Sequence, residues 1–341
     1  MTQSAFITGC EGLVLSDNER QFLRDSDPWG FILFGRNIDS PDQVRALVST
    51  MRDCVGREDA PVLIDQEGGR VQRLRPPHWA SYPATAYFGQ LEERSAGEGR
   101  KAARIGARLM AYDLLALGIT VDCLPVLDVP VENTTKAIGD RAYCGVPARV
   151  AELGHAAADG MLSGGVLPVI KHIPGHGRAV VDSHAELPRV SSPLVDLVAH
   201  DFAAFKPLAD FPLGMTAHVV FESIDPHNPA TLSSSVISTI IRGEIGFQGL
   251  LMSDDISMGA LQTDMADRAS GAIRAGCDIV LHCNGFMDEM QSVAANVPTL
   301  DGLALDRANT ALAVRPEPGV IDADELRKEF SALLSLVDWE A

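Results

Sequence analysis

The 341-residue sequence predicts an α/β protein of the (β/α)₈ TIM-barrel type, built as a single domain. Short apolar segments, typical of buried parallel strands, alternate about eight times with helical patterns. An open doubly wound sheet usually has fewer strands and a glycine-rich phosphate turn after the first one. No linker-like stretch divides the chain, so we expect one domain over 1–341, with C-terminal helices from about 286.

In the N-terminal half, each expected helix has a start or stop signal. Ser16 and Glu19 form a capping-box pattern that starts a short helix, and a Ser-Pro pair starts the next helix, over 41–54. Gly118 follows a long helical pattern over 99–117, where a left-handed residue is expected to end the helix. The expected strands are the apolar runs over 6–9, 30–34, 61–65 and 119–129.

The C-terminal half continues the same alternation. The expected strands lie over 166–170, 214–218, 249–255 and 278–282. The expected helices lie over 147–163, 193–208, 233–245 and 264–275, and amphipathic segments follow to the C-terminus.

Composition excludes several functional classes. The net charge of −18 disfavours nucleic acid or an anionic membrane as a partner, because phosphate repels an acidic protein. No apolar run is long enough to cross a bilayer, and the first residues lack the pattern of a signal peptide. The six cysteines show no CxxC pairing. We therefore expect a cytoplasmic protein with reduced thiols and a small-molecule substrate.

Charged and imidazole side chains stand at the ends of the expected strands. A barrel would bring all of these ends to one mouth. They are Arg36, Asp65, Asp128, Lys171, His172, His218, Asp254 and His282. The richest stretch is 171–188, where Lys171 and His172 end a strand and a polar loop with two glycines follows. Such a loop is a typical place for catalytic residues.

Two candidates for catalysis follow from local chemistry. Asp254 is the first of two adjacent aspartates at a strand end, where one could cap a helix while the other faces the mouth. A carboxylate there could act as a nucleophile or stabilise a developing cation. Asp182 and His184 are separated by one residue, so both side chains can lie on one side of an extended loop. A carboxylate bonded to an imidazole suits a proton donor near neutral pH, although a solvated loop explains the pair equally well.

A second group of charged residues suits recognition of sugar hydroxyls, because it combines carboxylate, ammonium, imidazole and guanidinium groups. Its members are Asp65, Arg73, Arg141, Lys171 and His172. For Arg141, in a loop, a surface salt bridge is an equally good explanation.

Five histidines at or after strand ends suggest a metal-dependent amidohydrolase as an alternative, since imidazole and carboxylate bind zinc. They are His172, His176, His184, His218 and His282. No His-x-His pair occurs on any expected strand, so we expect neither a metal nor another cofactor.

Six motifs in order along the first 285 residues resemble glycoside hydrolase family 3, and within it the single-domain bacterial β-N-acetylglucosaminidases of the NagZ type. They are GFILFGRN at 30–37, DQEGGRVQR at 65–73, IGDR at 138–141, the stretch 171–188, MTAHV at 215–219 and GFQGLLMSDDISM at 246–258. Departures are small: Ile173 replaces the usual Phe, and Ala142-Tyr143 replaces Ser-Phe.

The resemblance implies a retaining exo-β-N-acetylglucosaminidase that releases terminal N-acetylglucosamine from muropeptides in cell-wall recycling. It implies that Asp254 is the nucleophile and that His184, with Asp182, is the general acid/base. It assigns sugar binding to Asp65, Arg73, Arg141, Lys171 and His172. A family 3 phosphorylase or β-glucosidase and a non-catalytic sugar-binding protein remain alternatives.

Overall fold

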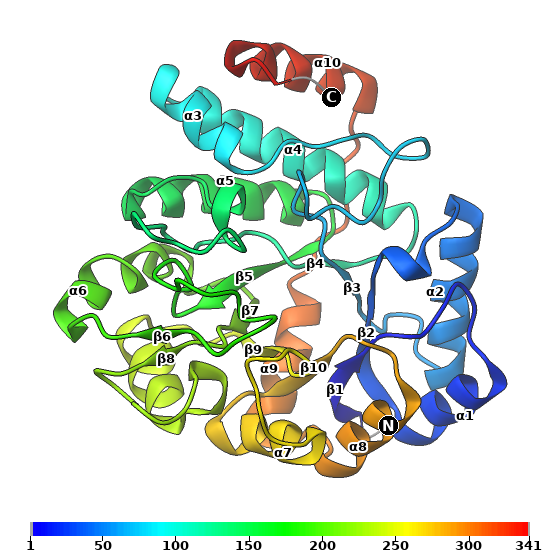
Figure 1. Cartoon of the computed structure of the whole chain (residues 1–341). Coiled ribbons are helices and arrows are strands. Elements are labelled where there is room, and N and C mark those ends of the chain that lie inside the picture. The colour runs from blue at the N-terminus through cyan, green and yellow to red at the C-terminus, as the bar shows by residue number, and fades with distance from the viewer. Residues whose placement is uncertain (1–2, 340–341) are drawn as a thin grey trace.

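The computed structural model describes residues 3–339 and confirms the predicted fold, because eight parallel strands of this range form a closed barrel surrounded by helices (Figure 1). β1 pairs with both β2 and β10, which closes the barrel. The barrel strands are β1 (Ser4–Thr8), β2 (Pro28–Leu33), β3 (Val62–Ile64), β4 (Val121–Asp122), β5 (Leu167–Ile173), β7 (Leu213–Thr216), β9 (Leu250–Asp255) and β10 (Ile279–His282).

Helices surround the barrel, in chain order except for the last two (Figure 1). They are α1 (Asp17–Ser26), α2 (Pro41–Val55), α3 (Ala86–Arg94), α4 (Glu98–Leu115), α5 (Pro147–Ser163), α6 (Leu194–Ala199), α7 (Met265–Ala275), α8 (Met287–Asn296), α9 (Gly302–Ala313) and α10 (Ala323–Leu334). The capping box of α1 is confirmed: Ser16 Oγ accepts from Glu19 N–H at 3.3 Å, and the Glu19 carboxylate accepts from Ser16 N–H at 2.7 Å. Gly118, after α4, has a φ of +81°, as expected.

The core has an inner and an outer layer. Side chains such as Ile7, Leu63 and Val169 fill the barrel, while alternate residues pack outward against the helices. Ala308 and Ala311 of α9 belong to the inner layer. The chain just before α9 pairs with the start of β1, so α9 closes the end of the barrel opposite the carboxyl ends of the strands. That closure leaves the other end as the mouth.

The predicted helix over 193–208 was wrong in its extent. α6 ends at Ala199, and short 3₁₀ turns replace the remainder. Asp201 is buried and pairs with Arg178 at 2.6 Å, which turns the chain inward. Pro207 has no N–H with which to continue a helix.

The predicted strand over 119–129 was too long, because β4 contains only two residues. Pro125 has no N–H to donate to a ladder. The segment nevertheless stays beside β5, since Leu127 N–H donates to the Lys171 carbonyl at 2.7 Å. The predicted helix over 233–245 forms a π-helix over Val236–Glu244.

Three elements, one helix and the two strands of a small sheet, were not predicted. α3 has only nine residues, and its N-cap, Thr85, makes no side-chain capping bond. β6 (Arg189–Val190) and β8 (Val220–Phe221) form a two-stranded parallel sheet that joins the loop after β5 to the loop after β7. Within residues 3–339, no helix is both long and apolar enough to span a membrane.

Candidate active site at the barrel mouth

A cavity of about 350 Å³ lies at the carboxyl ends of the barrel strands. The structure brings all eight candidate residues from the sequence into its lining, although they come from several strands and loops. These residues are Asp65, Arg73, Arg141, Lys171, His172, Asp182, His184 and Asp254. Of the eight strand-end residues expected at the mouth, four line the cavity, namely Asp65, Lys171, His172 and Asp254, whereas Arg36, Asp128, His218 and His282 do not.

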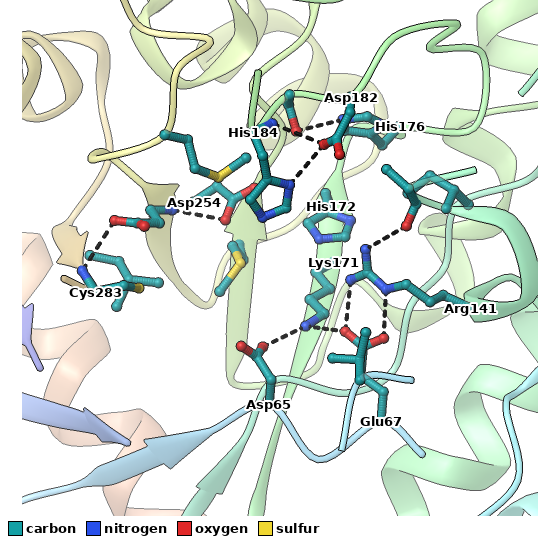
Figure 2. Close-up of a pocket in the computed structure, with 18 of the residues that line it drawn as sticks. Asp65, Glu67, Arg141, Lys171, His172, His176, Asp182, His184, Asp254 and Cys283 are labelled. Atoms are coloured by element: carbon teal, nitrogen blue, oxygen red, sulfur yellow. Dashed lines mark hydrogen bonds and ion pairs between the residues drawn. The ribbon is translucent and has the colours of Figure 1, made fainter. Parts of the chain in front are cut away.

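A chain of ion pairs forms one side of the cavity. The Lys171 ammonium lies between two carboxylates, with Nζ 2.9 Å from Asp65 Oδ1 and 2.6 Å from Glu67 Oε1 (Figure 2). Arg141 binds both oxygens of Glu67, each at 2.7 Å. Arg73 Nη2 lies 3.0 Å from Asp65 Oδ2. Lys171 is only 2 % exposed, so this chain of ion pairs is largely shielded from water.

These pairs keep every member charged. Burial by itself would raise the pKa of both carboxyl groups, but the neighbouring cations outweigh it. The pKa of Asp65 is held well below its usual range, and that of Glu67 is lowered to about 2. Burial would lower the pKa of Lys171, but its two carboxylate partners raise it instead.

The sequence motif at 65–73 contains Glu67 but gave it no predicted role. Its side chain is 1 % exposed and binds two cations. One signal was available: Glu67 is two residues from Asp65, so an extended segment directs both to the same side. Its partner Arg141 lies 74 positions away, and that pairing depends on the barrel topology.

A second buried group orients His172. Asp128 Oδ2 lies 2.7 Å from His172 Nδ1, and Asp128 Oδ1 accepts from the backbone N–H of His176 at 2.6 Å. Burial would raise the pKa of Asp128, but the adjacent His172 outweighs it and lowers the pKa to about 2. Since Nδ1 is occupied, Nε2 is the nitrogen of His172 that remains for a ligand.

The two adjacent aspartates have different environments. Asp255 is used locally: Oδ1 accepts from the N–H groups of Ser257 at 3.0 Å and Cys283 at 3.1 Å, and Oδ2 from the Ser257 hydroxyl at 2.6 Å. Asp254 accepts only one bond among the described residues, from Asp255 N–H to Oδ1 at 2.8 Å. Neither caps a helix, because Asp264 caps α7. Asp254 is thus the carboxylate with a free oxygen.

Asp254 remains ionised despite its surroundings. Burial would raise its pKa, but the imidazoles of His218 and His172, the Asp255 backbone N–H and the more distant Lys171 outweigh it. The pKa is therefore lowered, and the carboxylate is available as an anion at neutral pH.

Asp182 and His184 form a pair at the rim. His184 Nδ1 lies 2.8 Å from Asp182 Oδ1, which also accepts from the His184 backbone N–H at 2.9 Å. The two side chains are 69 % and 47 % exposed for His184 and Asp182. Figure 2 shows His184 directed toward the cavity that Asp254 also lines. An imidazole backed by a carboxylate here can exchange protons with a bound molecule.

The loop that carries this pair is fastened to the loop after β9. Ala260 N–H donates to the Ser183 carbonyl at 3.1 Å, and Gly259 N–H donates to the His184 carbonyl at 3.2 Å. At Gly177, a Cβ would lie 2.0 Å from the Val129 carbonyl oxygen, so only glycine fits there. Backbone contacts thus hold this loop near Asp254.

The other strand-end histidines have separate partners. His218 binds Thr231, and His282 Nε2 lies 2.8 Å from Glu289. Within residues 3–339, no three histidine, cysteine or acidic side chains gather in a way that could hold a metal ion.

Comparisons with known proteins agree with this geometry. Residues 9–313 match the glycosyl hydrolase family 3 N-terminal domain. β-Hexosaminidase of Alkalilimnicola ehrlichii is 39 % identical, covering 88 % of this chain and 86 % of its own. β-Hexosaminidase of Methylococcus capsulatus is 42 % identical, and the match covers 79 % of this chain and 80 % of that protein.

A solved structure matches the whole barrel. NagZ from Neisseria gonorrhoeae, in complex with N-trifluoroacetyl-D-glucosamine, has a TM-score of 0.85 and 30 % identity, covering 99 % of this chain and 97 % of that chain. The similarity drawn from the sequence motifs is confirmed. The chain belongs to glycoside hydrolase family 3.

Proposed function

We propose that this protein is a retaining, exo-acting β-N-acetylglucosaminidase. Two of the relatives above are β-hexosaminidases, and the structurally similar NagZ was solved in complex with N-trifluoroacetyl-D-glucosamine. The observation that carries the proposal is the pairing of Asp254, a carboxylate with a free oxygen, with the Asp182–His184 pair in one cavity.

The buried ion pairs would hold the terminal sugar. Asp65, Arg73, Arg141, Lys171 and His172 line the cavity and offer both donors and acceptors for hydroxyl groups. Because the ion pairs already fix these side chains, little rotamer freedom is lost when a sugar binds. Glu67 supports this set by fixing Arg141 and Lys171.

In the first chemical step, the free oxygen of Asp254 attacks the anomeric carbon. The bond from that carbon to the leaving oxygen breaks, and His184 Nε2 gives its proton to this oxygen. Asp182 accepts a hydrogen bond from His184 Nδ1 and stabilises the protonated imidazole before transfer. The products are a glycosyl ester on Asp254 and the free aglycone.

In the second step, the neutral His184 takes a proton from water. The water oxygen bonds to the anomeric carbon, and the ester bond to Asp254 breaks, which restores the carboxylate. Two displacements at one carbon retain its configuration.

Trapping the intermediate tests the proposal. A slow fluorinated N-acetylglucosamine donor should leave its sugar on the peptide that contains Asp254, detected by mass spectrometry after proteolysis. Asp254→Asn should take no label and should lose turnover. A label on Asp255, or turnover by Asp254→Asn at the wild-type rate, would contradict the assignment.

The physiological part of the proposal concerns substrate and place. We place the enzyme in the cytoplasm, where it would remove N-acetylglucosamine from muropeptides during cell-wall recycling. Incubation with a purified disaccharide muropeptide, with and without phosphate, should release free N-acetylglucosamine in both cases. Release of the sugar 1-phosphate would indicate a phosphorylase instead.

A further inference from the structure

Three buried side chains connect β7 to the end of β9, beyond the point where regular strand pairing stops. The last paired residues are Met215 and Met252. Two positions further along β9, the Asp254 N–H donates to Thr216 Oγ1 at 3.3 Å. His218 Nε2 lies 2.9 Å from the Asp255 carbonyl oxygen. Side chains of the β7 segment thus replace backbone partners at Asp254 and Asp255.

Thr231 joins these two contacts from a separate turn. Its hydroxyl lies 2.8 Å from Thr216 Oγ1 and 2.7 Å from His218 Nδ1. Thr216, His218 and Thr231 are each 0 % exposed. Water therefore cannot substitute for a lost partner without entering the core.

The number of protons on the imidazole and the two hydroxyl groups allows only one donor-to-acceptor direction along these hydrogen bonds. If the neutral imidazole donates from Nε2 to Asp255, its Nδ1 must accept, so the single proton of Thr231 points to Nδ1. The hydroxyl of Thr216 then donates to Thr231, and its oxygen accepts from Asp254 N–H. The Ala217 carbonyl, 3.1 Å from Thr231 Oγ1, is a longer alternative acceptor. In this order each hydroxyl donates once and accepts once, which strengthens neighbouring bonds.

We propose that Thr231, with Thr216 and His218, positions the Asp254 carboxylate for attack by fixing the backbone on both sides of it. None of the three lines the cavity, so they act through Asp254 and not on the sugar. The inference rests on the proposed role of Asp254 as nucleophile. Its physical basis is that a displacement of about 1 Å can lower the rate by about 10²-fold.

Thr231→Val is the central test, because it keeps the shape of the side chain and removes the hydroxyl. With an aryl N-acetylglucosaminide that needs little protonation, kcat should fall by about 10–100-fold, while KM changes by less than about two-fold. Thr231→Ser restores a hydroxyl and should recover kcat to within about three-fold of wild type. A Thr216→Val and Thr216→Ser pair should repeat this pattern.

Thr8→Val is the matched control. Thr8 is also buried at a barrel strand end, but among residues 3–339 its hydroxyl bonds only the Gly9 carbonyl, at 3.2 Å. Its kcat should equal that of wild type, and circular dichroism should confirm that all variants fold. If both Val variants at 216 and 231 keep wild-type kcat, or if the Ser variants fail to recover it, the positioning role is wrong. Activity in Asp254→Asn would instead overturn the proposed function.

Discussion

The two halves of the candidate site are built in opposite ways. The half around Lys171, which we propose binds the sugar, is buried, and each charge has at least one partner of opposite sign. The half made of Asp182 and His184, which we propose transfers the proton, is exposed and rests on a loop held by backbone hydrogen bonds. Binding demands fixed geometry, whereas a proton donor must leave room for the substrate to enter. The comparison therefore separates residues that stabilise the fold from residues that serve the reaction alone.

Within the Asp182–His184 half, the largest effect on rate is expected from His184→Ala. General acid catalysis contributes about 10²–10⁴-fold, so kcat should fall by that amount for substrates with poor leaving groups. Aryl glycosides with acidic phenols should lose far less in the glycosylation step, because their leaving group needs no proton. The free energy of unfolding should stay within about 0.5 kcal/mol, because the side chain is exposed.

His227→Ala provides the control, since His227 is also exposed but does not line the cavity. It should match wild type in both kinetics and stability. An equal loss for all leaving groups in His184→Ala would contradict its role as the acid.

Lys171→Met should break the buried half. The substitution leaves Asp65 and Glu67 facing each other in the interior without their shared cation. Removing one partner of a buried ion pair costs about 3–5 kcal/mol in the free energy of unfolding, which denaturant titration measures. Sugar binding should be lost as well.

Lys206→Met is the surface counterpart. Lys206 Nζ lies 2.6 Å from Glu244, and both side chains are more than one-third exposed. Loss of this pair should cost at most about 1 kcal/mol. Similar costs at the two lysines would show that burial does not distinguish the pairs.

The last comparison concerns His176, which stands between the two halves. Its backbone binds Asp128, and its Nε2 lies 3.1 Å from Ser183 in the loop. Burial lowers its pKa to about 4 from an ordinary 6.5. Between pH 6.5 and about 4, the unfolded chain binds this proton more tightly than the folded chain does. The contribution of neutral His176 to the free energy of unfolding is therefore fully present above pH 6.5 and is lost as the pH falls toward 4.

Comparing wild type with His176→Gln isolates this contribution. The difference between their free energies of unfolding should shrink by roughly 2–3 kcal/mol from pH 7 to pH 4, since one pKa unit corresponds to about 1.36 kcal/mol. Denaturant titrations at several pH values measure it. A difference independent of pH would show that His176 does not titrate in this window.

The sequence predicted the site best for residues that directly follow an expected strand, because the end of the strand fixes where such a residue lies in the barrel. Lys171 and Asp254 follow clear apolar runs, so the barrel hypothesis alone directs them to the mouth. Asp182 and His184 are adjacent enough for their pairing to follow from spacing.

The hydrophobic pattern of the sequence did not predict contacts between segments that are far apart in the chain. Thr231 lies in a turn with no helical or strand signal, and its partners come from β7. The break after α6 was missed for the same reason, since Asp201 turns inward to meet Arg178 of another loop. Local periodicity carries no information on such partners.

The small sheet of β6 and β8 gives the acid/base loop a second fixed end. The loop leaves β5 at Ile173 and is held again at Arg189, so His184 stays close to the cavity. Under the proposed function, this gives its imidazole a high effective concentration at the bound sugar. The entropy of closing such a loop changes slowly with its length, by about 0.6 kcal/mol per doubling. Insertions in this loop should therefore be tolerated, whereas a one-residue shift in β5 would remove Lys171 from its carboxylates.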